Sequence, residues 1–296
     1  MPYNRRSFFR TVSASVAAAL PAMPQSQRFR KPLGVQLYTV RAQLSTAADT
    51  TLKRIHDIGY TEVEAVRADL AMLAPILKKY DLAVPSVHME TGLLAGNRDE
   101  WNLPAGLTWE SAVDEAKSHG IEFVVIPYVR PSERRTPDEW RAFCDRLNRA
   151  GETARKAGAS LCYHNHAFEF GGQPGERLMD ILLDHTDPGL VGLELDVFWI
   201  GAAGLDPAEF LSRHAARVRL LHLKDKPKNM PIISDESKAK PSDFKEVGNG
   251  ALDFPAILRA AEKAGVAHYF VEQDHTPGDP VESLRVSYQH LRALTI

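Results

Sequence analysis

Two histidines and a glutamate stand close together at the end of a short hydrophobic run over 161–170. They are His164, His166 and Glu169. Imidazole and carboxylate groups bind divalent cations and accept protons, and both kinds of chemistry need several such groups in one place. A strand-type run that ends directly in these side chains therefore predicts the edge of a metal or catalytic site.

Three later hydrophobic runs end in the same way. A single such residue would more often cap a helix, carry a surface charge or, for histidine, sit in the core. Four runs with this ending are harder to explain in that way, because buried carboxylates need a compensating cation. We therefore predict that the run ends converge on one divalent cation. The donors in the later runs are Asp196, then His222 with Asp225, and Glu272 with Asp274.

The elements that would bring these runs together alternate along the chain from residue 31 onward. A helical segment follows each strand-type run, often with Ser, Thr or Asp at its start and Gly at its end. Such alternation gives right-handed βαβ units and a parallel sheet. It predicts an α/β fold, a single-domain (β/α)8 TIM barrel whose active site lies at the carboxyl ends of the strands. An open doubly wound sheet is the alternative, and it is disfavoured because no glycine-rich phosphate loop follows the first run. The strand-type runs are 32–40, 61–66, 82–90, 122–129, 159–164, 190–195, 217–224 and 268–273.

The composition is that of a globular chain with a sizeable core: 44% of the 296 residues are hydrophobic and the formal net charge is −2. This balance gives no reason to expect nucleic acid or a membrane surface as a partner. Two cysteines, Cys144 and Cys162, do not make a disulfide framework, and Cys162 is expected to be a buried apolar residue. The sequence leaves open whether the chain forms a homo-oligomer.

Residues 1–30 differ in kind from the rest. Arg5 and Arg6 precede two phenylalanines, and an uncharged stretch rich in Ala and Ser follows. The stretch is too short for a transmembrane helix and has the positive-then-apolar order of an export signal. The paired arginines resemble a bacterial twin-arginine signal. We therefore expect a signal peptide over 1–30, a folded enzyme over 31–296, and a periplasmic or otherwise exported location.

The ligand types limit the choice of ion. Asp196, His222 and Glu272 are the expected ligands from the last three runs, and the run over 161–170 supplies the fourth, for which Glu169 is preferred and His164 is the alternative. Ligands without a thiolate suit Mn, Mg, Co or Zn. A carboxylate in the fourth place would favour Mn or Mg, so one divalent ion is expected, with Mn first.

Several of these motifs resemble those of the sugar phosphate isomerase/epimerase family, within the xylose isomerase-like TIM barrel superfamily. The resemblance covers 31–294 and implies one divalent ion bound by strand-end Glu, Asp, His and Glu. Asp196, His222 and Glu272 match the last three places, while His164 stands where many members have Glu. The motifs are GVQLYTVR at 34–41, YHNHAFEF at 163–170, LELDVFW at 193–199, HLKD at 222–225 and VEQD at 271–274.

The resemblance also implies a reaction. Substrate contacts are expected at Gln36, His88 and Lys224, and Trp199 is placed to form a sugar-stacking wall. An ion on two adjacent oxygens of a keto sugar would acidify the neighbouring C–H and stabilise the enediolate. The proton would be taken by one of three side chains, and its return gives isomerisation or epimerisation, whereas a leaving group on the next carbon gives a lyase or hydratase acting on a 3-keto-glycoside. The candidate bases are Glu272, His166 and His164.

Two other functions are disfavoured by particular features. A DNA-repair enzyme like endonuclease IV, from the same superfamily, needs extra zinc-binding histidines, and Trp199 stands where such enzymes carry one of them. The near-neutral charge also argues against DNA. A non-catalytic sugar-binding protein would need no metal-bound base. The expected function is therefore a metal-dependent isomerase or epimerase acting on a small, non-phosphorylated keto sugar.

Overall fold

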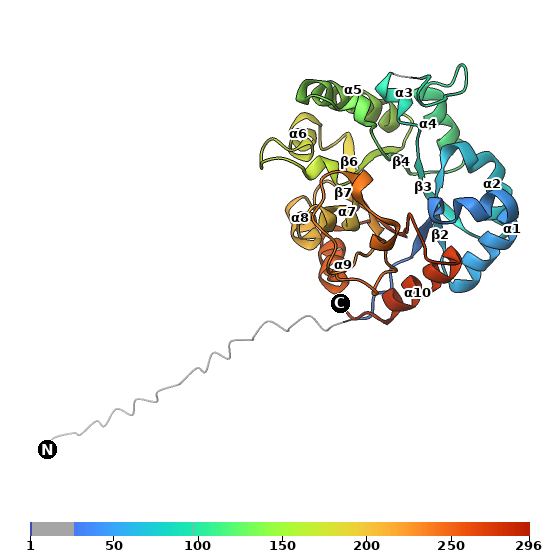
Figure 1. Ribbon diagram of the computed structural model, residues 1–296, viewed down its shortest axis with the longest axis vertical. Helices are drawn as coiled ribbons and strands as arrows, with labels where there is room; N and C mark the ends of the chain where they lie inside the picture. The colour runs from blue at the N-terminus through green and yellow to red at the C-terminus, as the bar shows by residue number, and fades with distance from the viewer. Residues whose placement is uncertain (2–26, 97) are drawn as a thin grey trace.

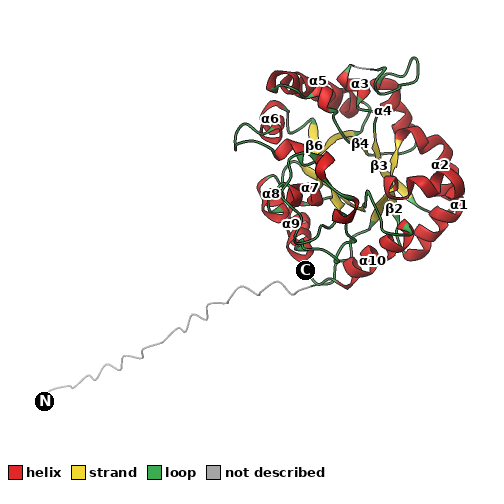
Figure 2. Cartoon of the chain, in the orientation of Figure 1, coloured by secondary structure: helices red, strands yellow, loops and turns green. Residues whose placement is uncertain are grey.

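A closed barrel of eight parallel strands occupies the centre of the molecule (Figures 1 and 2). The computed structural model describes Met1, residues 27–96 and residues 98–296. The strands follow chain order around the barrel, and β1 pairs with β8 to close it, which confirms the predicted TIM barrel. Their bounds are β1 Gly34–Gln36, β2 Glu62–Val66, β3 Ala83–His88, β4 Phe123–Ile126, β5 Ser160–His164, β6 Val191–Asp196, β7 Val218–Leu223 and β8 His268–Val271.

Helices form an outer ring around the strands, with α10 beside α1 where the ring closes (Figure 1). None of the described helices has the length and apolar character that a membrane span requires. The α-helices are α1 Arg41–Ile58, α2 Arg67–Lys79, α3 Gly92–Ala95, α4 Trp109–Ser118, α5 Pro137–Lys156, α6 Leu178–His185, α7 Val197–Ala202, α8 Pro207–Arg213, α9 Phe254–Ala264 and α10 Pro280–Ala293. Short 3-10 helices are η1 Leu37–Val40, η2 Pro131–Glu133, η3 Phe168–Phe170, η4 Glu236–Lys238 and η5 Pro241–Asp243.

Helix starts agree with the local sequence where a capping residue stands before a proline. Thr136 precedes α5, and its hydroxyl accepts a hydrogen bond from the amide of Glu139 at 3.2 Å. Asp206 precedes α8 and accepts one from the amide of Ala208 at 2.8 Å. Each cap satisfies an amide that the helix itself leaves without an acceptor, which fixes where the helix begins.

The first unit departs from the prediction. The strand expected over 32–40 ends at Gln36, and α1 begins at Arg41 rather than near Ser45. The side chain of Gln36 accepts a hydrogen bond from the amide of Tyr38 at 2.8 Å and turns the chain into η1. A side-chain contact of this kind overrides the extended tendency of the local sequence.

The folded part also begins earlier than the predicted residue 31. The amide of Gln27 donates to the carbonyl of Ile296 at 2.9 Å, and the reverse bond measures 2.8 Å. Phe29 is buried, with its ring 5.3 Å from that of Tyr269. Most of the predicted export signal falls on residues 2–26, which lie outside the described residues.

The barrel interior changes from apolar to polar along its axis. Phe123, Val125, Cys162, Leu220 and Phe270 form a buried apolar cluster, as expected for Cys162. Towards the carboxyl ends of the strands the interior stays buried but carries ionisable groups. These are Glu64, His88, His164, Glu194, Asp196, His222, Lys224 and Glu272. The carboxyl ends of the strands therefore form a polar bowl, and the apolar cluster fills the barrel below it.

Candidate active site

The strand register brings the predicted donors together. Asp196 on β6 is paired with His222 on β7, and His164 on β5 is paired with Glu194 on β6. Side chains two residues apart on a strand share a face, so Glu194 and Asp196 both point into the barrel at successive depths. The bowl is therefore built in two levels.

The upper level contains the outer group, which we define as His164, Asp196, His222 and Glu272. One donor atom from each of these buried side chains lies within 4.8 Å of the others. Nδ1 of His222 lies 2.9 Å from Oε2 of Glu272, and Nε2 of His164 lies 3.6 Å from Oδ2 of Asp196. The structure thus brings together three predicted ligands, Asp196, His222 and Glu272, with His164 as the fourth member.

Glu169, the preferred fourth ligand from the sequence, is not part of this group. It is fully buried, but Oε1 accepts a hydrogen bond from the hydroxyl of Tyr163 at 2.6 Å and Oε2 accepts one from the amide of His166 at 2.8 Å. The 3-10 helix η3 turns Glu169 away from the strand end and towards its own loop. Its role here is to shape the segment that carries His166.

The two carboxylate oxygens of Asp196 make different contacts. Oδ1 accepts hydrogen bonds from the amides of Phe198 at 2.9 Å and Trp199 at 3.3 Å, which caps α7. Oδ2 faces the outer group. Because the chain passes from strand to helix at this residue, the carboxylate is held in one orientation from both sides.

Lys224 is a buried cation beside the outer group. Its Nζ lies 2.9 Å from Oδ2 of Asp196, 2.6 Å from Oε2 of Glu272 and 2.9 Å from Oδ2 of Asp274. Burial alone would lower the pKa of Lys224, but these three carboxylates raise it well above its usual value. The ammonium is therefore charged and balances part of the negative charge at this level.

The lower level contains an inner group, which we define as Glu64, His88 and Glu194 with the inward-facing nitrogens of His164 and His222. Oε2 of Glu194 lies 3.0 Å from Nε2 of His88, 3.1 Å from Nδ1 of His164 and 3.2 Å from Nε2 of His222. Oε2 of Glu64 lies 2.9 Å from Nε2 of His88 and 2.7 Å from Nε2 of His222.

Sequence reasoning missed Glu64 and Glu194 as members of a site. Both stand within strand-type runs rather than after them, and each is fully buried. A carboxylate inside a run expected to be buried was the available signal, since such a group needs a partner.

The charges of the two levels shift several pKa values. Burial would lower the pKa of His88, but Glu64 and Glu194 outweigh it and raise the pKa to about 9. Burial raises the pKa of Asp196 to about 6, against the opposing effect of Lys224. For Glu272 burial would raise the pKa, but Lys224 and other positive neighbours lower it well below its usual value.

His166 differs from the other imidazoles of the bowl. Burial, together with the ammonium of Lys224, holds the pKa of His166 well below its usual value, so the ring is neutral at neutral pH. Its Nδ1 is buried and has no hydrogen-bond partner among the described residues. The ring lies 5.3 Å from that of Trp199 and 5.1 Å from that of Tyr128.

A cavity of about 470 Å³ opens above the two levels. Five of the predicted site residues line it: His88, His164, His166, Lys224 and Glu272. A smaller cavity of about 260 Å³ adjoins it and is lined by Trp199 and again by His166. Gln36 lines neither, because its amide is engaged below: Nε2 donates to Glu64 at 2.9 Å and Oε1 accepts from the Tyr38 amide.

The long segment after β7 reaches back over this opening. Glu236 in η4 accepts a hydrogen bond from the hydroxyl of Tyr128 at 2.7 Å and pairs with Arg134 at 2.5 Å. Asp225, predicted as a donor to the site, instead accepts hydrogen bonds from backbone amides of the same segment, including Gly248 at 3.0 Å and Gly250 at 2.9 Å. It therefore shapes the covering segment and does not enter the bowl.

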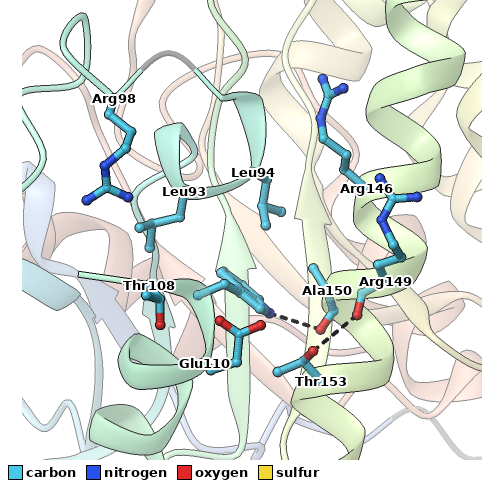
Figure 3. A pocket seen from close by; sticks show the side chains of 10 residues that line it. Leu93, Leu94, Arg98, Thr108, Glu110, Arg146, Arg149, Ala150 and Thr153 are labelled. Atoms are coloured by element: carbon cyan, nitrogen blue, oxygen red, sulfur yellow. Dashed lines mark hydrogen bonds between the residues drawn. The ribbon is translucent and has the colours of Figure 1, made fainter. Parts of the chain in front are cut away.

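A separate cavity of about 410 Å³ lies outside the barrel between α3, α4 and α5 (Figure 3). Arg98, Arg146 and Arg149 line it, and the indole of Trp109 closes part of it by donating to the carbonyl of Ala150 at 3.0 Å. It shares no lining residue with the cavity above the strand ends. None of the site residues predicted from the sequence lines this outer cavity.

The donor set of the outer group fits a divalent cation. Two carboxylates and two imidazoles without a thiolate suit Zn, Co and Mn alike. With His164 in place of Glu169, the group has one imidazole more and one carboxylate fewer than predicted. The argument that placed Mn first therefore no longer applies.

Comparisons with known proteins agree with this architecture. A family model described as xylose isomerase-like TIM barrel matches residues 52–294. The inosose dehydratase of Geobacillus thermodenitrificans is 32% identical over 166 residues, which are 53% of this chain and 55% of that protein. The chain spans about half the length of this and the next curated relatives that it matches.

Solved structures share the fold at lower identity. A sugar phosphate isomerase/epimerase from Parabacteroides distasonis has a TM-score of 0.70 and 24% identity, covering 94% of this chain and 98% of that one. The IolI protein with a bound zinc atom has a TM-score of 0.65 and 18% identity, covering 88% of this chain and 96% of that one.

Proposed function

The chain belongs to the xylose isomerase-like TIM barrel family, and from that premise we propose that it is a divalent-metal-dependent enzyme that removes a proton next to the carbonyl of a keto sugar or keto-cyclitol. The observation that carries the proposal is the outer group, in which buried oxygen and nitrogen donors from consecutive strand ends surround one point. The IolI protein, which has the same fold, holds a zinc atom in its solved structure, and this supports a bound cation in the present chain.

A divalent cation held by His164, Asp196, His222 and Glu272 would polarise the substrate carbonyl and make the neighbouring C–H more acidic. His166 is the best-placed base, because the residue lines the cavity and its ring is neutral. Glu272 is a weaker base, since Oε2 is already paired with His222 and Lys224.

Lys224 supplies the matching acid. Lys224 lines the cavity, and its charged ammonium can donate a proton to an oxygen on the carbon beyond the enolate. In the proposed dehydration, the C–H proton moves to the imidazole of His166, the C–O bond breaks, and the departing hydroxyl leaves as water with a proton from Lys224. A carbon–carbon double bond conjugated to the carbonyl remains. The name of the curated relative, inosose dehydratase, supports this outcome.

Isomerisation or epimerisation is the second candidate. His166 and Lys224 both lie on the cavity wall, so a proton removed from the substrate could be returned at another face or at the next carbon. A substrate without a leaving group beside the enolate would have only this route. Both candidates share the same first step.

Export through the twin-arginine route is part of the proposal. The arginine pair and the apolar stretch that follows it support this localisation. An exported enzyme would meet non-phosphorylated sugars rather than the sugar phosphates of the cytoplasm. A non-phosphorylated keto sugar or keto-cyclitol is therefore the proposed substrate.

Incubation of metal-loaded protein with an inosose and with ketohexoses in D2O, followed by NMR, tests the proposal. Dehydration would give an enone and loss of one oxygen. Isomerisation or epimerisation would place deuterium on the carbon next to the carbonyl with no loss of oxygen. If neither deuterium uptake nor water loss occurred with any keto compound, the proposed enolisation would be refuted.

An Asp196→Ala variant tests the link to the metal. It should lose bound divalent cation, as measured by elemental analysis, together with deuterium exchange. Metal content equal to that of the wild type would remove the outer group as the binding site. Ser45→Ala, on the exposed surface of α1, is a matched control that should keep both properties.

A further inference from the structure

The inner group has the composition of a metal site but lies one level below the outer group. Nitrogen and oxygen donors of His88, His164, Glu194 and His222 approach one another within 4.8 Å, and all four residues are buried. Glu64 adds a fully buried carboxylate whose Oε2 lies 2.7 Å from Nε2 of His222. Separations near 3 Å between different donor atoms are those expected around a cation at normal ligand distances.

The two levels differ in how their negative charge is balanced. In the outer group the ammonium of Lys224 already lies within 2.9 Å of Asp196 and within 2.6 Å of Glu272. The inner group has two fully buried carboxylates, Glu64 and Glu194, and no lysine or arginine among its contacts in the described part of the chain. Buried carboxylates need a balancing positive charge, which at this level has to come from protonated imidazoles or from a bound ion.

A second observation points the same way. Oε1 of Glu194 is buried and has no hydrogen-bond partner among the described residues. An unpartnered carboxylate oxygen inside a protein is unfavourable, because it has lost its hydrating water without gaining another partner. Three imidazoles surround the other oxygen of the same side chain, and two of them, His88 and His222, also contact Oε2 of Glu64.

We infer that the inner group is a divalent-cation site of its own, formed by Glu64, His88 and Glu194 with one nitrogen of His164 or His222. The inference rests on the proposed function only in that both use these two shared rings. Nitrogen and carboxylate donors without a thiolate suit Zn, Co or Mn. The site lies below the substrate cavity, so its ion supports the outer group from beneath.

The two shared imidazoles allow a cation at each level while every ring stays neutral, so that no ring has to become an imidazolate. His222 presents Nε2 to Glu64 and Glu194 and Nδ1 to Glu272. His164 presents Nδ1 to Glu194 and Nε2 to Asp196. A neutral ring binds a cation through one nitrogen and donates a hydrogen bond through the other. Each ring can therefore serve one level as a ligand and hold a carboxylate of the other level in place, so the ring that binds the inner ion leaves the outer ion three protein ligands.

The test measures metal content in the full chain after loading with Zn or Mn and removal of free ion. Glu64→Gln and Glu194→Gln should each hold one ion per chain fewer than the wild type, whereas Asp196→Asn should lose the outer ion and keep the inner one. Glu62→Gln is the matched control, because it makes the same change two residues earlier on β2, where Glu62 pairs with His268 at 2.9 Å. It should keep the wild-type content.

Wild-type metal content in both Glu64→Gln and Glu194→Gln would overturn the inference and leave imidazolium rings as the balancing charge. If Asp196→Asn kept full content while the inner variants lost it, the proposed outer site would fail and the inner site would stand. Should the inner variants not fold, anomalous scattering from crystals of the Mn-loaded wild type decides the question. A peak within about 2.5 Å of Glu194 and His88 supports the site, and its absence there refutes it.

Discussion

Both ends of the barrel carry paired glutamate and histidine side chains, but the pairs differ in burial and in the number of neighbouring donors. At the amino end, Glu62 at the start of β2 pairs with His268 at the start of β8, at 2.9 Å. At the carboxyl end, Glu64 on the same β2 pairs with His222 at 2.7 Å, and Glu272 directly after β8 pairs with that ring at 2.9 Å. One pair is isolated and partly exposed, while the other belongs to a fully buried cluster.

The difference shows that a histidine–glutamate pair is not a site by itself. The side chains of His268 and Glu62 are 17% and 12% exposed, so water screens the pair and stabilises each charge. His222 and Glu64 are both 0% exposed, and several strands add further donors around them. Convergence and burial, rather than residue type, distinguish the two ends.

The largest effect is expected from His222→Gln at the carboxyl end. The change removes a member of both levels, so bound metal should fall and kcat/KM should drop by about 10³-fold, the scale seen when an electrostatic stabiliser is lost. Elemental analysis and the deuterium-exchange assay measure the two effects. Unchanged metal content would mean that the carboxyl end of the barrel does not bind metal, as we expect for the amino end.

The second largest effect is expected from Lys224→Met, and it concerns the stability of the protein. The change leaves Asp196, Glu272 and Asp274 without their ammonium partner, which should destabilise the metal-free protein by about 3 kcal/mol. Added divalent cation should restore most of this loss, because it supplies the missing positive charge. Urea unfolding with chelator and with metal measures the difference; equal losses in both conditions would show that the ion does not bind at this level.

Glu169→Gln should change how stability depends on pH. Burial raises the pKa of Glu169 to about 8, so the folded protein keeps this proton where the unfolded chain, near 4.5, has lost it. Between these values the folded state binds more protons, and stability falls as pH rises by up to about 1.4 kcal/mol per pH unit from this group. The variant, which is neutral throughout, should show a flatter slope in urea unfolding, and an identical slope would contradict the assignment.

The smallest effect is expected from His268→Gln at the amino end. The isolated pair with Glu62 is worth about 1 kcal/mol or less, so unfolding should change little, and metal content and activity should match the wild type. Paired with His222→Gln, this variant makes the same substitution at the two ends of one barrel. A loss of metal here would break the comparison.

The fold could be predicted because its evidence is local. Each helix start and strand run leaves a pattern within a few residues, as Thr136 and Asp206 show, and closure then follows from repetition of the unit. Strand-end donors such as Asp196 and His222 were also accessible, because parallel strands bring their carboxyl ends to one place.

The positions of the other site residues could not be predicted, because they depend on the path of the backbone and not on the spacing of residues in the sequence. Glu169 stands five residues after His164, and only the path of η3 decides that it points to Tyr163 instead of the bowl. Glu64 joins the inner group through the register of β2 against β3, where an irregularity follows Glu62. Such a shift changes the depth at which a side chain enters the barrel.

The carboxylate of Asp196 connects the outer group to the helix that borders the smaller cavity. One of its oxygens anchors the first turn of α7, and that turn carries Trp199, whose indole lines the smaller cavity. We therefore expect the fluorescence of Trp199 to change when the charge beside the other oxygen changes, because the same carboxylate anchors the turn that carries the indole.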